Sequence, residues 1–379
     1  MKLNRLYLRD FRNYEEVSLD FSPGVNLFLG DNAQGKTNLL EAVCYLSTGK
    51  SFRSRKELEL IRFGAEFAEL QADIFSYDRE KSLRTILFAS RRPRQLFLSG
   101  VKEKTFGEHL AGQLLTVLFC PEDLLVLKGG SAGRRKLLDS ALCQLRRGYD
   151  AALTEYQRLL DHKSRILKDW HEDRSLLELL PDFNERLCRL GAEIISSRAG
   201  YLKILGELAA GHHAACAGEK EELSLSYATV SQITDPLGDK MKIYGELREH
   251  MSRLSSAELD SGMCLSGPHK DDFEVFLNGR SLKSYGSQGQ TRTAAIALKL
   301  AERDIFLKDT GQQPVLLLDD VLSELDEGRQ DFILNHIHQG QVLITCCEKD
   351  RFTHMGKNFT VRGGQVTELP QEGSACIFP

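Results

Sequence analysis

The stretch Gly30-Asp31-Asn32-Ala33-Gln34-Gly35-Lys36-Thr37 fits the phosphate-loop pattern G-x-x-x-x-G-K-[ST]. It follows an apolar run at residues 25–29 and precedes residues 36–46, where apolar side chains recur at helical spacing. Glycines let a backbone curl around a phosphate, and the helix N-terminus adds partial positive charge. We therefore expect these eight residues to bind the phosphates of a nucleotide such as ATP.

Further roles are expected for two residues of this loop and for two carboxylates far along the chain. Lys36 should reach the β- and γ-phosphates as a candidate catalytic residue, and Thr37 should ligate Mg²⁺. The apolar run 315–318 predicts a buried strand ending in Asp319 and Asp320. Asp319 is expected to hold Mg²⁺ beside the loop. Asp320 is a candidate catalytic residue, because a carboxylate there can orient or deprotonate the attacking water.

The two motifs lie near opposite ends of a chain whose 379 residues exceed one ordinary core. Strand patterns and the hairpin signals Ser99-Gly100 and Asn278-Gly279 flank a region from about 134 to 215 in which helix-forming residues dominate. The expected fold class is α/β, a P-loop ATPase head formed by both chain ends with a mainly helical inserted domain. The expected limits are 1–133 and 261–379 for the head, and 134–260 for the insertion.

Composition excludes several classes of protein. Hydrophobic residues make up 41% and charged residues 27% of the chain, which excludes collagen-like, disordered and low-complexity classes. No apolar run reaches the length of about 18 residues that a membrane-spanning helix needs, and charges interrupt residues 1–10 too often for a signal peptide. The nine cysteines are an odd number without a C-x-x-C pair. We therefore expect a cytoplasmic protein with reduced thiols.

Basic residues gather in the N-terminal part of the chain, although the net charge is −4 overall. Such density is typical of contacts to DNA phosphates, which are sensitive to salt and independent of sequence. A solvated sheet face is the alternative for the same residues. The candidates are Lys50, Arg53, Arg55, Lys56, Arg91, Arg92 and Arg94.

His269, Asp271 and Asp272 raise the question of a metal site. The sequence has no second cluster of ligands to accompany them. We favour a turn at Gly267-Pro268 whose side chains position the hairpin that follows.

Several motifs resemble those of known ATPases. Ser287-Gln288-Gly289-Gln290 resembles the signature motif of ABC-type ATPases, and residues 323–326 resemble their D-loop. Taken in order, six motifs resemble the RecF family of bacterial recombination proteins over nearly the whole chain. They are residues 10–15, 32–38, 48–53, 119–124, 267–272 and 287–290, the last with Arg292.

This resemblance implies an ABC-type head, as in SMC proteins, without their long coiled coils. It implies that Ser287, Gly289 and Gln290 face the γ-phosphate bound by a second subunit, so that two ATP molecules are sandwiched in a homodimer. Hydrolysis then acts as a switch. We expect it to be slow, since Asp320 stands where ABC transporters usually carry glutamate. Ala33 stands where many relatives carry glycine.

The resemblance also implies partners. They are DNA, with recognition of duplex at single-strand gaps, RecR together with RecO, and the RecA-loading and SOS pathway. Two alternatives are a P-loop small-molecule kinase, which predicts monomeric turnover, and an ABC subunit of a transporter, which needs a membrane partner. The basic cluster favours DNA over the transporter.

Overall fold

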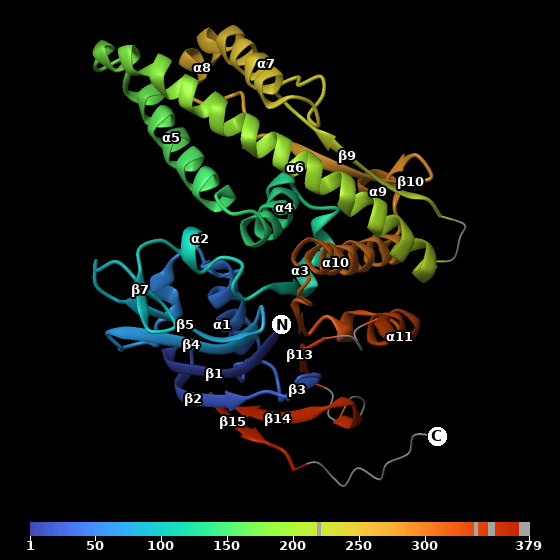
Figure 1. The fold of residues 1–379 in the computed structure, drawn as a ribbon. Helices are drawn as coiled ribbons and strands as arrows, with labels where there is room; N and C mark the ends of the chain where they lie inside the picture. Colours follow the sequence, from blue (N-terminus) through green and yellow to red (C-terminus); the bar gives the residue numbers. More distant parts are fainter. Residues whose placement is uncertain (218–220, 337–339, 348–352, 371–379) are drawn as a thin grey trace. The chain divides into compact units, whose positions relative to one another are not determined.

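The computed structural model describes residues 1–217, 221–336, 340–347 and 353–370. It divides the chain into two compact units, each drawn in Figure 1. The first combines Met1–Leu124 with Glu302–Pro379, and the second is Leu125–Ala301. The second unit includes residues 261–301, which the sequence analysis grouped with the head. The physical reason is that strand β10 in this segment pairs with β9 of the insertion.

An antiparallel sheet of the first unit has the strand order β2-β1-β4-β5-β6-β7. Buried and more exposed residues alternate along β4, as expected for a strand that buries one face. The predicted hairpin at Ser99-Gly100 is confirmed, because Leu98 pairs with Val101 across it. The strands are β1 (Lys2–Phe11), β2 (Tyr14–Asp20), β4 (Phe67–Ser76), β5 (Arg79–Phe88), β6 (Gln95–Leu98) and β7 (Val101–Glu103).

The other sheet of this unit is mostly parallel, with the order β15-β14-β3-β13-β12-β8. Among its described strands, only β15 pairs antiparallel, with β14. All five residues of β12 are buried, which explains its apolar run, because parallel strands are covered on both faces. The strands are β3 (Val25–Leu29), β8 (Thr116–Phe119), β12 (Val315–Asp319), β13 (Val342–Cys346), β14 (Lys357–Arg362) and β15 (Gln365–Glu368).

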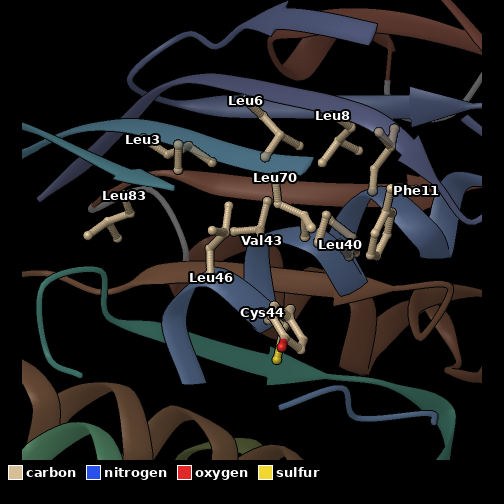
Figure 2. Close-up of a cluster of buried hydrophobic side chains, with 14 of the residues drawn as sticks. Leu3, Leu6, Leu8, Phe11, Leu40, Val43, Cys44, Leu46, Leu70 and Leu83 are labelled. Carbon is tan, nitrogen blue, oxygen red and sulfur yellow. The ribbon is translucent and has the colours of Figure 1, made fainter. Parts of the chain in front are cut away.

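Helix α1 (Lys36–Thr48) packs against strands of both sheets and forms the centre of the core. Its predicted apolar stripe is buried, with Leu40, Val43 and Leu46 each 0% exposed. Figure 2 shows these side chains facing Leu6 and Leu70 of the antiparallel sheet. The helix that begins at the phosphate loop is thus anchored by the core of the unit.

Short helices complete the connections between these strands. They are η1 (Glu57–Leu60), α2 (Phe106–His109), α3 (Pro121–Val126), η3 (Leu322–Glu324), α11 (Glu327–His336) and η4 (Thr353–Met355). Within the described residues, no helix combines the length and the apolar character that crossing a membrane requires.

Long helices dominate the second unit. Helix α6 packs against α5, α7 and β9, and Figure 1 shows α5 and α6 side by side. The helices are α4 (Ser131–Leu145), α5 (Tyr149–Asp169), η2 (Arg174–Leu179), α6 (Leu180–Ala217), α7 (Lys240–Arg253), α8 (Ser255–Ser261), α9 (Leu282–Tyr285) and α10 (Gln288–Thr310), of which residues 302–310 belong to the first unit.

A three-stranded antiparallel sheet accompanies these helices, in the order β11-β10-β9. Its strands are β9 (Leu223–Ala228), β10 (Asp272–Leu277) and β11 (Arg280–Ser281). The predicted turn between β10 and β11 is confirmed, because Asn278 and Gly279 have φ of 49° and 73°, as a type I′ turn requires.

The segment 267–272 is a turn held by polar contacts. Asp271 is fully buried and accepts from Tyr227 Oη at 2.9 Å, and Asp272 forms an ion pair of 2.7 Å with Arg134. His269 Nδ1 lies 2.8 Å from Tyr156 Oη. No group of three or more potential metal-ligating side chains is found in the part of the chain that the structure describes. These contacts favour the turn over the metal site.

Candidate nucleotide-binding site

The phosphate loop connects β3 to α1, as the sequence predicts. A Cβ atom at Gly30 would lie 2.3 Å from the carbonyl oxygen of Val361. Gly35 has φ +116°, and a Cβ there would lie 2.6 Å from the Asn13 side chain. Both positions therefore exclude larger residues, and this explains why the motif has glycine at each of them.

Neighbouring residues hold the loop from outside. Tyr14 Oη donates to the Gly35 carbonyl at 2.9 Å, and Asn13 Nδ2 donates to the Gln34 carbonyl at 3.0 Å. The Gln34 side chain accepts from the backbone N–H of Gly363 at 2.7 Å. The Gln34 side chain thus stabilises the loop. The group of Gln34 that would bind a phosphate is therefore its backbone N–H.

Lys36 places its ammonium group inside the curve of the loop. Nζ donates to the carbonyls of Gly30 at 2.6 Å and Asp31 at 3.0 Å, and it lies 3.2 Å from Cys347 Sγ. The residue is only 6% exposed. A buried positive charge that faces carbonyls and a thiol is suited to the oxygens of a bound phosphate.

Thr37 and Asp319 meet as the sequence analysis expects. Thr37 Oγ1 donates to Asp319 Oδ1 at 2.9 Å, and Thr345 Oγ1 donates to the same oxygen at 2.9 Å. Burial raises the pKa of Asp319, while the hydrogen bonds from Thr345 and Thr37 oppose that shift and the charge of Asp320 adds to it. The carboxylate is thus held in one orientation at the end of β12.

These oxygens fit a magnesium ion. Mg²⁺ prefers hard oxygen ligands and takes few of them from a protein, leaving positions for water and phosphate. A hydroxyl and a carboxylate oxygen converge at the start of α1, directly after the phosphate loop. Thr37 and Asp319 are therefore the side chains that would hold the ion.

Asp320 follows directly in an unusual backbone conformation. Its φ is 51°, in the left-handed region, and its N–H donates to Thr345 Oγ1 at 2.9 Å. Aspartate adopts this region more readily than most non-glycine residues. The extended backbone of β12 therefore ends at Asp319, and the chain turns at Asp320.

Two residues that lie at this site are not among the site residues predicted from the sequence. Thr345 bridges Asp319 and the Asp320 amide, and Cys347 Sγ lies 3.2 Å from Lys36 Nζ and 3.0 Å from Asn32 Oδ1. Both follow from β13 lying between β3 and β12. The signal for them was the buried-strand pattern at 342–345, but the strand order was needed to use it.

The signature residues Ser287, Gly289 and Gln290 belong to the second unit, whereas the loop and Asp319 belong to the first. Gly289 and Gln290 lie in the first turn of α10, which Ser287 precedes. Ser287 is exposed at this helix start. An exposed helix N-terminus with a hydroxyl beside it is suited to an anion.

The basic candidates fall into different surroundings. Six of them are exposed, namely Lys50, Arg53, Arg55, Lys56, Arg91 and Arg92. Arg53 also donates to Asn38 Oδ1 at 3.2 Å, and Asn38 lies in the first turn of α1, directly after the phosphate loop.

Arg94 is the half-buried member of this set. It donates to Tyr45 Oη at 2.9 Å, to the Gly49 carbonyl at 2.7 Å and to Glu57 Oε1 at 2.6 Å. Arg91 and Arg92 precede it on the exposed surface. They are therefore better suited than Arg94 to contact a large partner.

Sequence comparisons cover nearly the whole chain. The family described as the RecF/RecN/SMC N terminal domain matches residues 2–368. A DNA replication and repair protein RecF from Acetivibrio thermocellus is 35% identical over 364 residues, which are 96% of this chain and 98% of the relative. The RecF of Staphylococcus aureus is 38% identical over 362 residues, 93% and 95% of the two chains.

Solved structures agree with the sequence comparisons. The recombination mediator protein RecF in the RecFOR pathway, solved as RecF-ATPrS, matches with TM-score 0.91 and 34% identity over 97% of this chain and 98% of the other. The RecF-ATP structure matches with TM-score 0.89 and 34% identity over 97% of both chains. The Smc head domain of Pyrococcus furiosus matches at TM-score 0.54 and 16% identity, which bears on the fold alone. The predicted fold class, an ABC-type P-loop ATPase head, is confirmed.

Proposed function

Because this chain belongs to the RecF family of DNA replication and repair proteins, we propose that it is an ATP-dependent DNA-binding protein of recombinational repair and replication. The observation that carries its ATP-dependent part is the hydrogen bond between Thr37 of the phosphate loop and Asp319, and family membership carries the role in repair and replication. Membership of this family argues against the two alternatives, a small-molecule kinase and a transporter subunit.

ATP binding is assigned to the loop of residues 30–37. The backbone N–H groups and the Lys36 ammonium would hold the phosphates, and Thr37 and Asp319 would hold Mg²⁺. When bound, the ion offsets the negative charge of the β- and γ-phosphates. Asp320 orients the attacking water or takes its proton. Because its side chain is one carbon shorter than that of glutamate, it positions the water less well and hydrolysis is weak. The role of hydrolysis is that of a switch.

The second half of each ATP site comes from a second copy of the chain. Ser287, Gly289 and Gln290 offer a hydroxyl and a helix N-terminus to the γ-phosphate bound by the partner. ATP then stabilises a two-fold homodimer, and hydrolysis removes that stabilisation.

Chromatography with light scattering tests this dimer. With ATP and Mg²⁺ the wild-type mass should double, and Lys36→Met and Ser287→Arg should each remain monomeric. Ser284→Arg is the matched control, because Ser284 is an exposed residue of α9 and should not affect dimerisation. A Ser287→Arg variant that dimerises normally contradicts the two-subunit site.

Mixing the two defective variants makes this test sharper. In a two-fold dimer of Lys36→Met with Ser287→Arg, one site combines both defects and the other is intact. The mixture should therefore form heterodimers, although neither variant dimerises alone. A pocket completed within one chain predicts no such rescue.

DNA binding is assigned to the exposed basic residues Lys50, Arg53, Arg55, Lys56, Arg91 and Arg92, and to the half-buried Arg94. Contacts to phosphates explain affinity for duplex DNA without sequence preference. The preferred substrate is duplex at a single-strand gap. By analogy with the relatives named for the RecFOR pathway, RecR and RecO are partners in loading RecA and in the SOS response.

Charge reversal tests the DNA surface. Arg91→Glu with Arg92→Glu should weaken duplex binding and lower the slope of log affinity against log salt by about 1 for each DNA phosphate that is no longer neutralised. The control is Lys168→Glu with Arg174→Glu, which changes the net charge equally at exposed residues of the second unit. If both pairs of substitutions weaken duplex binding equally, the effect comes from net charge and not from a DNA contact of Arg91 and Arg92.

A further inference from the structure

Ser287 and Gln290 form reciprocal hydrogen bonds at the start of α10. The Gln290 N–H donates to Ser287 Oγ at 3.2 Å, and the Ser287 N–H donates to Gln290 Oε1 at 2.9 Å. This capping box satisfies two N–H groups that the helix cannot satisfy itself. It also fixes the position of the Ser287 oxygen while leaving the hydroxyl hydrogen to be donated elsewhere.

The far end of the Gln290 side chain is held by Glu221. Gln290 Nε2 donates to Glu221 Oε1 at 2.7 Å, and Glu221 Oε2 lies 3.0 Å from Nε2 of His213 on α6. An ionised carboxylate only accepts hydrogen bonds, so the amide and the imidazole both donate to it. Side-chain contacts thus run without interruption from Ser287 to α6.

His213 forms the buried end of this network. It is 0% exposed, and its other ring nitrogen, Nδ1, has no hydrogen-bond partner among the described residues. A buried polar atom without a partner costs free energy, so packing alone does not favour a histidine at this position. The contact with Glu221 is the interaction for which the imidazole is suited.

We propose that Glu221 and His213 are positioning residues for the signature segment. They hold the Gln290 amide, and through it they fix Ser287 in the orientation that meets the partner's γ-phosphate. The inference rests on the proposed ATP-dependent dimer, because only there does Ser287 reach a nucleotide. Neither residue touches ATP, so their loss should weaken dimerisation without weakening the binding of ATP to the monomer.

Glu221→Ala tests the central contact, with Glu222→Ala as the matched control, because Glu222 is the exposed neighbouring residue. With ATP and Mg²⁺, Glu221→Ala should weaken dimerisation about tenfold, as expected for removal of a hydrogen bond to a charged group. The affinity of the monomer for ATP in dilute solution should equal that of the wild type. A change confined to dimerisation distinguishes positioning from general loss of structure.

Two further variants decide whether the network acts through Gln290. Adding Glu221→Ala to Gln290→Ala should weaken dimerisation no further, because the two residues act in series. His213→Gln should weaken dimerisation less than Glu221→Ala, since Glu221 still meets Gln290. Independent, additive effects of Glu221→Ala and Gln290→Ala would overturn the inference.

The outcomes also separate this inference from the proposed function. If Ser287→Arg remains monomeric and Glu221→Ala dimerises like the wild type, the positioning role is wrong and the two-subunit site stands. If Ser287→Arg dimerises normally, both are wrong. If Glu221→Ala weakens ATP binding by the monomer as much as dimerisation, the residue is structural and the inference is overturned.

Discussion

Thr37 and Asp319 are 282 residues apart in the chain, yet the hydroxyl of one donates to the carboxylate of the other at 2.9 Å. The contact joins the end of the phosphate loop to the end of β12. A second hydroxyl, that of Thr345, donates to the same carboxylate oxygen at 2.9 Å. The carboxylate is therefore positioned by two side chains that a metal ion could replace or share.

Asp319→Asn should lower Mg²⁺-dependent ATP hydrolysis about 100-fold, because the carboxylate charge that holds the ion is removed while the side-chain shape is kept. ATP binding measured in EDTA should change little. Asp331→Asn, the same substitution at an exposed residue of α11, is the control. If Asp319→Asn hydrolyses ATP at the wild-type rate, Asp319 is not a ligand of the metal ion.

Cys347 should make nucleotide binding sensitive to alkylation. Its Sγ lies 3.2 Å from Lys36 Nζ, so an N-ethylmaleimide adduct would occupy the space of the phosphate oxygens. Modification should weaken ATP binding at least about tenfold, as overpacking does, and bound ATP should slow the reaction. Cys347→Ser treated in the same way should bind ATP normally. Full affinity after complete modification of Cys347 contradicts this placement.

Ala33→Gly should stabilise the protein, because Ala33 has φ of 64° within the phosphate loop. A left-handed conformation costs a non-glycine residue about 1–2 kcal/mol, which glycine avoids. We expect the free energy of unfolding to rise by about 1 kcal/mol. Urea unfolding monitored by circular dichroism measures this change. Ala151→Gly, in helix α5, should instead destabilise by about 1 kcal/mol. A destabilised Ala33→Gly variant would mean that the alanine side chain makes compensating contacts.

His269 and Asp271 should give opposite trends of stability with pH. Burial lowers the pKa of His269 from 6.5 to about 4, so its contribution is complete above pH 6.5 and is lost as the pH falls towards 4. Burial raises the pKa of Asp271 from 3.8 to about 6, so its contribution is complete below pH 3.8 and is lost as the pH rises through 6. Each shift corresponds to roughly 3 kcal/mol, so the two nearly cancel between pH 4 and 6.5.

Single substitutions should reveal these trends. Asp271→Asn should make the second unit lose stability relative to wild type as the pH falls from 6.5 to 4, and His269→Gln should reverse the slope. Trp170, the only tryptophan of the chain, lies in this unit, so its fluorescence during urea unfolding is the measurement. Parallel pH profiles for both variants would show that neither group titrates in this range.

Local elements were predicted well because each one is encoded by neighbouring residues. The helical spacing of apolar residues in α1 and the turns at Ser99-Gly100 and Asn278-Gly279 match the structure. The meeting of Thr37 with Asp319 was also predicted, since the ends of parallel strands share one edge of a sheet. Strand β9 was not predicted, and it explains why residues 261–301 join the second unit.

The basic cluster marks where prediction from sequence stopped. Arg91 and Arg94 have the same charge and lie three positions apart, but Arg94 is held by Tyr45, Gly49 and Glu57 while Arg91 is exposed. The partners of Arg94 come from segments 37 to 49 residues away. Charge counting along the chain cannot separate the two residues, because exposure depends on these distant contacts.

The amino-acid sequence by itself determined the phosphate loop, the acidic strand end and the hairpins, because loop chemistry, side-chain period and turn residues are local properties. Only the tertiary structure decided that Thr345 and Cys347 join the nucleotide site and that Glu221 and His213 reach Gln290. The physical reason is that strand order and helix packing are set by the burial of whole faces, and no short stretch of residues carries that information.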